Sequence, residues 1–112
     1  TNYTRYEGEL NKNRLPHGKG IKQYFPGRHL YQGDFVNGKM HGKGQMTWGN
    51  KVVYQGDFVA DKPEGKGQMS WPDGSVYEGE FLRGKLHGKG KMTRHNGVVQ
   101  EGKWNNDQFV EP

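Results

Sequence analysis

The stretch Tyr54–Val76 reads YQGDFVADKPEGKGQMSWPDGSV. Its order of tyrosine, glycine, aromatic ring, paired glycines and methionine recurs at residues 31–53 and, with changes, at 77–99. A fixed period of 23 residues is typical of repeat architectures, in which stacked units share a core that none forms alone. We predict one array, with repeat 1 at 6–30, repeat 2 at 31–53, repeat 3 at 54–76, repeat 4 at 77–99 and a partial repeat 5 at 100–112. Because the chain opens and closes inside partial repeats, we expect it to be a segment of a longer protein.

Each repeat is predicted to form a β-hairpin. Large residues or glycines alternate with polar residues along Tyr54–Val59 and again along Gly67–Trp71, which is the period of a strand. Ala60–Glu64 separates the two segments and is predicted to be the hairpin turn. Pro72–Ser75 joins one repeat to the next, and its Asp-Gly pair favours a tight turn between strands. No stretch has helix caps or a helical period, so we predict an all-β fold.

The alternation also predicts a register for the sheet. Three cross-strand pairs define it, namely Tyr54–Trp71, Gly56–Met69 and Phe58–Gly67. The large side chains then share one face and form three columns across the strands. In the first column rings lie beside rings, in the second glycines alternate with methionines, and in the third rings alternate with glycines. Neighbouring strands lie ~4.8 Å apart, so a glycine beside a ring leaves space for the ring to lie over the next backbone.

Composition limits the kind of protein that this chain can be. Of its 112 residues 29% are hydrophobic, 12% are aromatic and 19 residues are glycine, and the mean hydropathy is −1.16. The chain is too poor in aliphatic residues for an ordinary two-layer globule and too rich in rings for simple disorder. It contains no cysteine, which excludes disulfides and thiolate metal sites and fits a reducing compartment. No apolar run approaches the length that crosses a membrane.

These residues resemble the MORN (membrane occupation and recognition nexus) repeat. The family pattern, Tyr-x-Gly-x-aromatic followed by Gly-x-Gly, is found at Tyr31–Phe35 with Gly42–Gly44, Tyr54–Phe58 with Gly65–Gly67, Tyr77–Phe81 with Gly88–Gly90 and, more weakly, Tyr6–Leu10 with Gly18–Gly20. The resemblance implies a single elongated, twisted antiparallel sheet with a groove on one side. It also implies a protein-binding or scaffold role in the cytoplasm, at cytoskeletal or membrane-associated structures, and phospholipid binding has been attributed to the family as well.

Three recurring motifs favour structural interpretations. Gly-Lys-Gly occurs four times, but neither the third glycine nor the helix of a phosphate-binding loop follows it. His17, His41 and His87 share one slot, yet equivalent residues of successive repeats lie ~9–10 Å apart, too far to share a metal, so we predict turn residues. Acids and lysines alternate on the polar face, which predicts cross-strand charge pairs rather than catalytic carboxylates. We therefore expect no metal, no cofactor and no enzymatic activity from these residues.

The aromatic and methionine face is the predicted binding site. A single-layer sheet has no second layer to cover this face, and contiguous exposed apolar surface marks interaction sites. We expect a helix or peptide of another protein to bind there in an aromatic groove. The predicted contacts are Tyr31, Phe35, Met46, Trp48, Tyr54, Phe58, Met69, Trp71, Tyr77, Phe81, Met92 and Trp104.

Other functions stay open at the level of sequence. One alternative is a peripheral membrane adaptor that binds anionic phospholipids through Lys43, Lys66 and Lys89. A further alternative is an accessory module of an enzyme whose catalytic domain lies outside this chain. Acids between the basic residues disfavour nucleic acid, despite a net charge of +5. The strand Gln100–Trp104 is expected to lack a partner within the chain, which predicts more repeats, or a homodimer or end-to-end assembly through the terminal strands.

Overall fold

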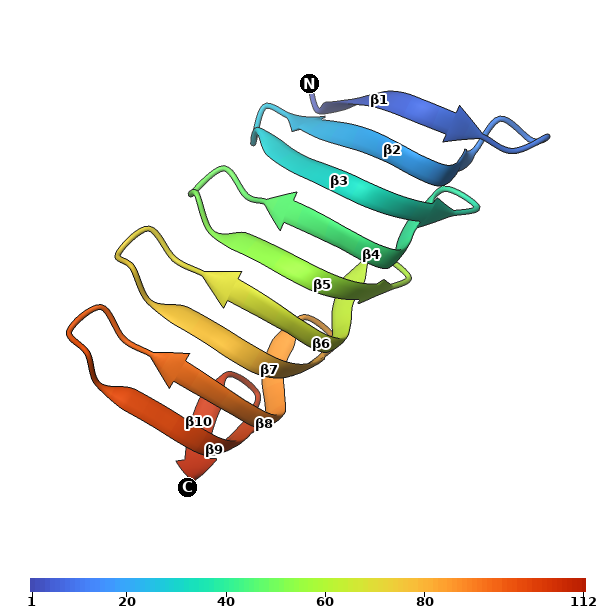
Figure 1. Ribbon diagram of the computed structural model, residues 1–112. Helices are drawn as coiled ribbons and strands as arrows, with labels where there is room; N and C mark the ends of the chain where they lie inside the picture. Colours follow the sequence, from blue (N-terminus) through green and yellow to red (C-terminus); the bar gives the residue numbers. More distant parts are fainter.

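The chain folds into one antiparallel sheet of ten strands, and the computed structural model describes residues 1–112. Strands follow one another across the sheet in their sequence order (Figure 1). They are β1 (Tyr3–Leu10), β2 (Pro16–Phe25), β3 (His29–Val36), β4 (Lys39–Thr47), β5 (Val53–Val59), β6 (Lys62–Ser70), β7 (Val76–Leu82), β8 (Lys85–Thr93), β9 (Val99–Asn105) and β10 (Gln108–Glu111). The molecule is elongated, with extents of 48 × 24 × 20 Å. The predicted all-β sheet of hairpins is confirmed, and no helix suited to crossing a membrane is present.

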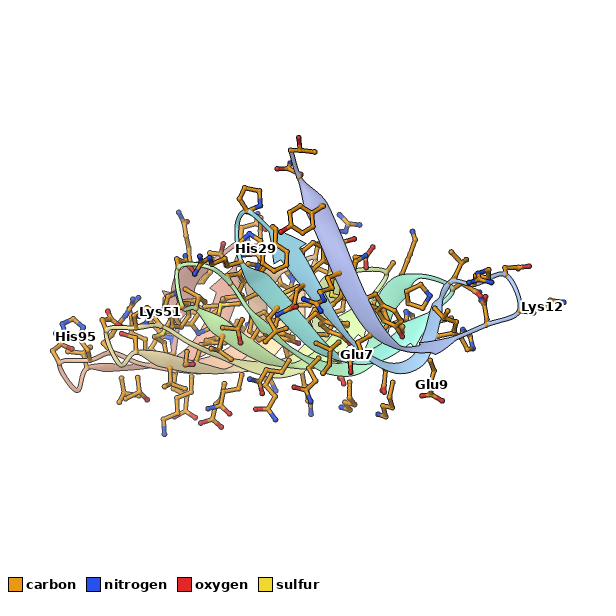
Figure 2. The ribbon with its side chains drawn as sticks, turned by 90° about the horizontal axis from the view of Figure 1, so that it is seen from above. Glu7, Glu9, Lys12, His29, Lys51 and His95 are labelled. Carbon is orange, nitrogen blue, oxygen red and sulfur yellow. The ribbon has the colours of Figure 1, made fainter.

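Two rows of turns run along the long edges of the sheet. The hairpin rim consists of the turns inside the hairpins, at residues 11–15, 37–38, 60–61, 83–84 and 106–107. The connecting rim consists of the turns between hairpins, at residues 26–28, 48–52, 71–75 and 94–98. Lys12 marks the hairpin rim in Figure 2, and Lys51 and His95 mark the connecting rim. Glu9 points to the polar face and His29 lies on the opposite, aromatic face (Figure 2).

The hairpin turn of repeat 3 is shorter than predicted. Only Ala60 and Asp61 form it, with φ angles of 47° and 76°, and residues 62–64 already belong to β6. Two-residue loops with positive φ at both positions match the twist of the flanking strands. The Asp61 carboxylate accepts a hydrogen bond from the Met40 amide and the Asp61 amide donates one to the Met40 carbonyl, each at 2.9 Å. The turn is thereby attached to the preceding repeat.

The register differs from the predicted one by two residues at Tyr54 and Gly56 and by four residues at Phe58. The observed pairs in repeat 3 are Tyr54–Met69, Gly56–Gly67 and Phe58–Pro63, so the three predicted pairs are wrong. Trp48 and Trp71 do not belong to a ring-on-ring column, because both lie beyond the strands at the start of connecting turns. A shift of two or four residues leaves every side chain on its own face, so the aromatic face survives the change of partners.

The two-residue turn sets the pairing beside it, and a β-bulge in each hairpin then changes the register by two residues. Opposite the single residue Asp34, strand β4 carries three residues, 41–43. The first glycine of the Gly-Lys-Gly motif, Gly42, takes a φ of 111° there, and the Lys43 amide donates to Asp34 Oδ2 at 3.0 Å. Equivalent bonds of 2.6 Å run from the Lys19 amide to Glu9 and from the Lys89 amide to Glu80. Gly-Lys-Gly is thus a bulge whose exposed amide is held by a carboxylate, which is the structural interpretation expected from the sequence.

The core is a row of tyrosine and phenylalanine rings packed edge to face. Tyr54 contacts Phe58 of its own repeat and Phe81 of the next one, with ring centroids 5.1 and 4.8 Å apart. Its hydroxyl donates to the Asp57 carbonyl at 2.7 Å, and the ring covers Gly67. Tyr31 and Tyr77 repeat the arrangement, and all three tyrosines are 0% exposed. Each tyrosine therefore joins two repeats, which gives a one-layer sheet a continuous core.

Buried tyrosines predict a loss of stability at alkaline pH. Burial raises the pKa of the Tyr77 hydroxyl to about 12 and raises the pKa of Tyr31 and Tyr54 as well. Because the folded-state pKa lies above the unfolded value of ~10, the neutral phenol stabilises the fold below pH ~10, and this stabilisation is lost as pH rises toward ~12. We expect tyrosinate absorbance from these residues to appear together with loss of the β-sheet circular dichroism. Ionisation of every tyrosine near pH ~10 with the sheet intact would contradict this.

The recurring histidines lie in strands beside the hairpin turns, not in the turns as predicted. His17 Nδ1 accepts a hydrogen bond from the Asn37 amide at 3.2 Å, and His41 Nδ1 accepts one from the Ala60 amide at 3.3 Å. Glu64, which interrupts the series, accepts the equivalent bond at 2.8 Å through its carboxylate. His17, His41 and Glu64 thus bind the first residue of the next hairpin turn and hold successive repeats in line, whereas His87 Nδ1 is buried without a hydrogen-bond partner.

The C-terminal end of the array also corrects a prediction. The Gln100–Trp104 segment has partners on both sides, because its strand β9 pairs with β8 and with β10. Phe109 of β10 lies opposite Trp104, with ring centroids 5.3 Å apart. Strand β10 was missed because its four residues carry none of the glycines of the repeat. The edge strands are β1 and β10, and assembly through them stays a prediction.

Candidate protein-interaction site

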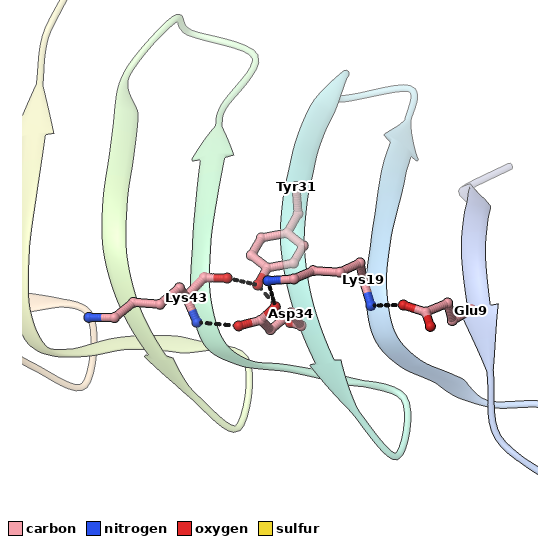
Figure 3. A network of polar contacts seen from close by, with 5 residues as sticks. All are labelled: Glu9, Lys19, Tyr31, Asp34 and Lys43. Atoms are coloured by element: carbon pink, nitrogen blue, oxygen red, sulfur yellow. Dashed lines mark hydrogen bonds and ion pairs between the residues drawn. The ribbon is translucent and has the colours of Figure 1, made fainter.

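The polar face carries lysines and carboxylates that bind one another across neighbouring repeats. In the network of Figure 3, Lys19 Nζ forms an ion pair with Asp34, and the Lys19 amide donates to Glu9. The hydrogen bond from the Lys19 ammonium is the main reason that the pKa of the Asp34 carboxyl is lowered. Tyr31 donates from the other face to the Asp34 carbonyl at 2.7 Å. Charge pairing on this face was predicted, and it is confirmed here.

The three lysines predicted for lipid binding are not a free cationic row. Lys43 forms an ion pair with Asp57 of the next repeat, and Lys66 lies opposite Glu80 in the register. Only Lys89 faces another cation, Lys103. Alternating signs weaken the field that would attract anionic lipid. Phospholipid binding through these lysines stays a prediction that the arrangement of charge does not favour.

Most of the twelve predicted contact residues are core residues. Ten of them are at most 9% exposed, and only Trp48 and Trp71 are partly exposed. The buried ten are Tyr31, Phe35, Met46, Tyr54, Phe58, Met69, Tyr77, Phe81, Met92 and Trp104. Their burial follows from the edge-to-face row, in which rings cover each other rather than face solvent. Partner contact by these residues stays untested, and burial restricts it to the places where their edges line a hollow.

One such hollow lies on the aromatic face over repeats 3 and 4. It has a volume of 430 Å³ and is open to solvent. Its apolar lining consists of Met69, Trp71, Leu86 and Met92, and its polar lining includes Asp73, Ser75, Arg94 and Asp107. We call it the apolar hollow. It joins residues from the connecting rim and from the hairpin rim, so the two rims approach each other across the aromatic face at this point.

Charged groups are fixed around the apolar hollow by hydrogen bonds. The Ser75 amide donates to Asp73 Oδ1 at 2.8 Å and is the main cause of the lowered pKa of that carboxyl. Asp107 Oδ1 accepts from the Leu86 amide at 2.8 Å. Arg94 stands where repeats 2 and 3 have a tryptophan, and it donates two hydrogen bonds, of 3.1 and 2.9 Å, to Gln100 Oε1. The hollow therefore offers an apolar floor with both signs of charge in fixed positions.

A comparison with known protein families matches the MORN repeat at residues 6–27, 31–53, 54–76 and 77–99. The chain belongs to the MORN repeat family. MORN repeats are generally interaction or membrane-associated modules and generally non-catalytic. Tyrosines, phenylalanines and glycines of the core recur in the matched repeats, whereas Leu86 and Arg94 of the apolar hollow do not recur as the same residue types.

Among curated proteins, one relative shares part of this MORN array. Over 39 residues the chain is 51% identical to a protein named inactive protein tyrosine kinase pTKL, from Plasmodium berghei (strain Anka). The match covers 35% of this chain and 3% of that protein. The chain thus spans only a small part of the length of the curated relative that it matches.

Sequence reasoning missed several residues of the apolar hollow. Leu86 occupies the repeat slot of Met40 and Pro63, and the predicted turn Ala60–Glu64 includes Pro63, which lies instead in the strand that follows the turn. Asp107 lies in the partial repeat, where no hairpin had been expected. Leu86 would have been found by aligning the residues that follow each hairpin turn, and Asp107 by its repeat position, which is that of Asp61.

Proposed function

We propose that this MORN array is a non-enzymatic protein-interaction module that binds an amphipathic helix or peptide of another protein at the apolar hollow. The observation that supports this is the hollow itself. It is a place on the aromatic face where methionine, leucine and tryptophan side chains line a solvent-open space of 430 Å³. Four of the nine lining residues are apolar, and concave sites that combine apolar side chains with placed polar groups are typical binding sites.

The lining suits a polypeptide partner better than a small polar ligand. Met69 and Met92 are adaptable apolar surfaces, and Trp71 is the kind of large ring that anchors a partner side chain. Asp73 and Asp107 favour a basic residue beside the partner's apolar one, and Arg94 favours an acidic residue on the other side. The same fixed charges give the partner a direction in the hollow. An enzyme's catalytic domain outside this chain would be compatible with this function.

A matched pair of tryptophan variants tests the proposal. Trp71 lines the hollow, whereas Trp48 holds the same repeat position one unit earlier and does not line it. We would select binders from a displayed library of short helical peptides and measure their Kd by calorimetry. Trp71→Ala is expected to weaken binding by ~2 kcal/mol or more, about 30-fold, while Trp48→Ala leaves the Kd nearly unchanged.

Chemical shifts place the bound peptide independently of affinity. Methyl signals of Met69, Leu86 and Met92 should move on titration, with the variants shown to be folded by circular dichroism. Selected peptides that bind both tryptophan variants equally, and that shift only signals of the polar face, would rule out the hollow as the site.

A further inference from the structure

A row of exposed aliphatic side chains lies beside the hairpin rim, on the polar face. Val36, Val59 and Leu82 end strands β3, β5 and β7, one after each core phenylalanine, and they are 40, 48 and 41% exposed. Because successive strand residues point to opposite faces, these three side chains point away from the aromatic core. The core therefore does not account for three large aliphatic side chains at equivalent positions.

Each of these aliphatic residues is paired with a lysine. The register places Val36 opposite Lys39, Val59 opposite Lys62 and Leu82 opposite Lys85. We call these six residues the lysine–aliphatic stripe. A lysine covers apolar surface with its stem and keeps its ammonium in water, so each pair presents one apolar patch and one positive charge.

The lysines of the stripe have no acidic partner. Ion pairs in the chain involve Lys19, Lys43, Lys103 and His95 instead. Neighbouring carboxylates are already bound, since Asp34 and Asp57 pair with lysines within the sheet. Acids in or beside the hairpin rim accept hydrogen bonds from backbone amides: Asp61 from Met40, Glu64 from Arg83 and Asp107 from Leu86. Arg83, exposed on the same rim, adds a further cation.

The spacing of the stripe selects the shape of its partner. Equivalent residues of successive repeats are two strands apart, ~9.6 Å. In an α-helix every seventh residue returns to the same face after ~10.5 Å, which matches this spacing. An extended strand covers ~9.9 Å in three residues, but its first and fourth side chains point to opposite faces. A polyproline II segment has a suitable rise, yet such segments dock in aromatic grooves, and the stripe contains no aromatic residue.

We propose that the lysine–aliphatic stripe binds an acidic amphipathic helix of another protein, with a glutamate or aspartate at every seventh position and apolar residues between them. The carboxylates pair with Lys39, Lys62 and Lys85, and the apolar residues cover Val36, Val59 and Leu82. This surface lies on the opposite face from the apolar hollow, so it is a second site, independent of the proposed function.

A protein helix fits this surface better than a lipid bilayer. Tryptophan and tyrosine are the preferred anchors at membrane interfaces, and here both tryptophans that are partly exposed, Trp48 and Trp71, belong to the aromatic side of the sheet.

The experiment compares two triple variants of equal charge. Lys39→Gln/Lys62→Gln/Lys85→Gln removes the cations of the stripe, and Arg28→Gln/Lys51→Gln/Lys91→Gln removes three exposed cations elsewhere. The probe is a synthetic helix of about 21 residues, long enough for three such positions, with glutamate at every seventh position and leucines four residues later. The control probe is a helix of the same composition with glutamate at every fifth position. Binding is measured by fluorescence anisotropy, and circular dichroism confirms that every variant is folded.

We expect the seventh-position helix to bind the unaltered chain at least ~10-fold more tightly than the fifth-position helix. The stripe variant should lose this preference and the control variant should keep it. Salt of ~500 mM should weaken the binding, because exposed pairs are screened. Equal affinity for both helices, or a preference retained in the stripe variant, would overturn the proposal. Binding of phosphatidylserine vesicles that the stripe variant loses, without binding of either helix, would also overturn it and would assign the stripe to a membrane.

Discussion

Gly67→Ala is expected to destabilise the sheet by about 3 kcal/mol, because the added methyl group collides with a buried ring. A Cβ built on Gly67 would lie 2.5 Å from both Cε1 and the hydroxyl oxygen of Tyr54. Tyr54 cannot move aside, since its ring is fixed between Phe58 and Phe81 and its hydroxyl is bonded to Asp57. The measurement is the free energy of unfolding in urea, compared between the Gly67→Ala variant and the unaltered chain.

Two comparisons separate this clash from other effects of alanine. In a Tyr54→Leu background the same substitution should cost much less, so the two changes should be strongly non-additive. Gly97→Ala meets nothing within 4 Å and carries only the cost of its φ of 88°, about 1–2 kcal/mol. Additive effects of Gly67→Ala and Tyr54→Leu would contradict the packing of the ring over the glycine.

Phe58→Ala is expected to cost about 4 kcal/mol, a large fraction of the stability of a domain of this size. Phe58 is 2% exposed and is held between Tyr31 of repeat 2 and Tyr54 of its own repeat. Its removal opens a cavity at a junction between repeats, where a single-layer sheet has no second layer that can collapse into the space.

The neighbouring residue provides the matched control for Phe58. Val59 is 48% exposed and points to the polar face, so Val59→Ala should change the free energy of unfolding by less than about 0.5 kcal/mol. A loss below ~1 kcal/mol for Phe58→Ala, comparable with a surface change, would show that the ring row is not the core. Both variants can be compared by urea unfolding followed by circular dichroism.

The contacts of the core rings explain how a chain with few aliphatic residues stays folded. Each core tyrosine uses three kinds of contact at once: a glycine below it, a phenylalanine beside it and a phenylalanine or tryptophan of the following repeat. Stability in such an array resides largely at the junctions between neighbouring units. Residues outside these junctions are then free to differ among repeats, as Leu86, Arg94 and Asp107 of the apolar hollow do.

The sequence by itself determined the period, the all-β class and the division into an aromatic and a polar face. Residues such as Tyr54, Gly56 and Phe58 recur every 23 positions, and both the period and the strand alternation are properties of the order of residues alone. The predicted charge pairing on the polar face follows from the same alternation. Family membership could be inferred from these residues because the core glycines and rings are repeated in tandem.

The tertiary structure alone decided the register, the burial and the form of the candidate site. A slip of two residues leaves every side chain on its face, so alternation cannot distinguish the Tyr54–Met69 pair from the predicted Tyr54–Trp71 pair. The two-residue turn at Ala60 and Asp61 and the bulge opposite Asp57 together make that choice, and the bulge depends on positive φ at Gly65. Once the register is set, Trp71 lies outside the ring row and beside Leu86, so the apolar hollow results from contacts across strands that the order of residues does not contain.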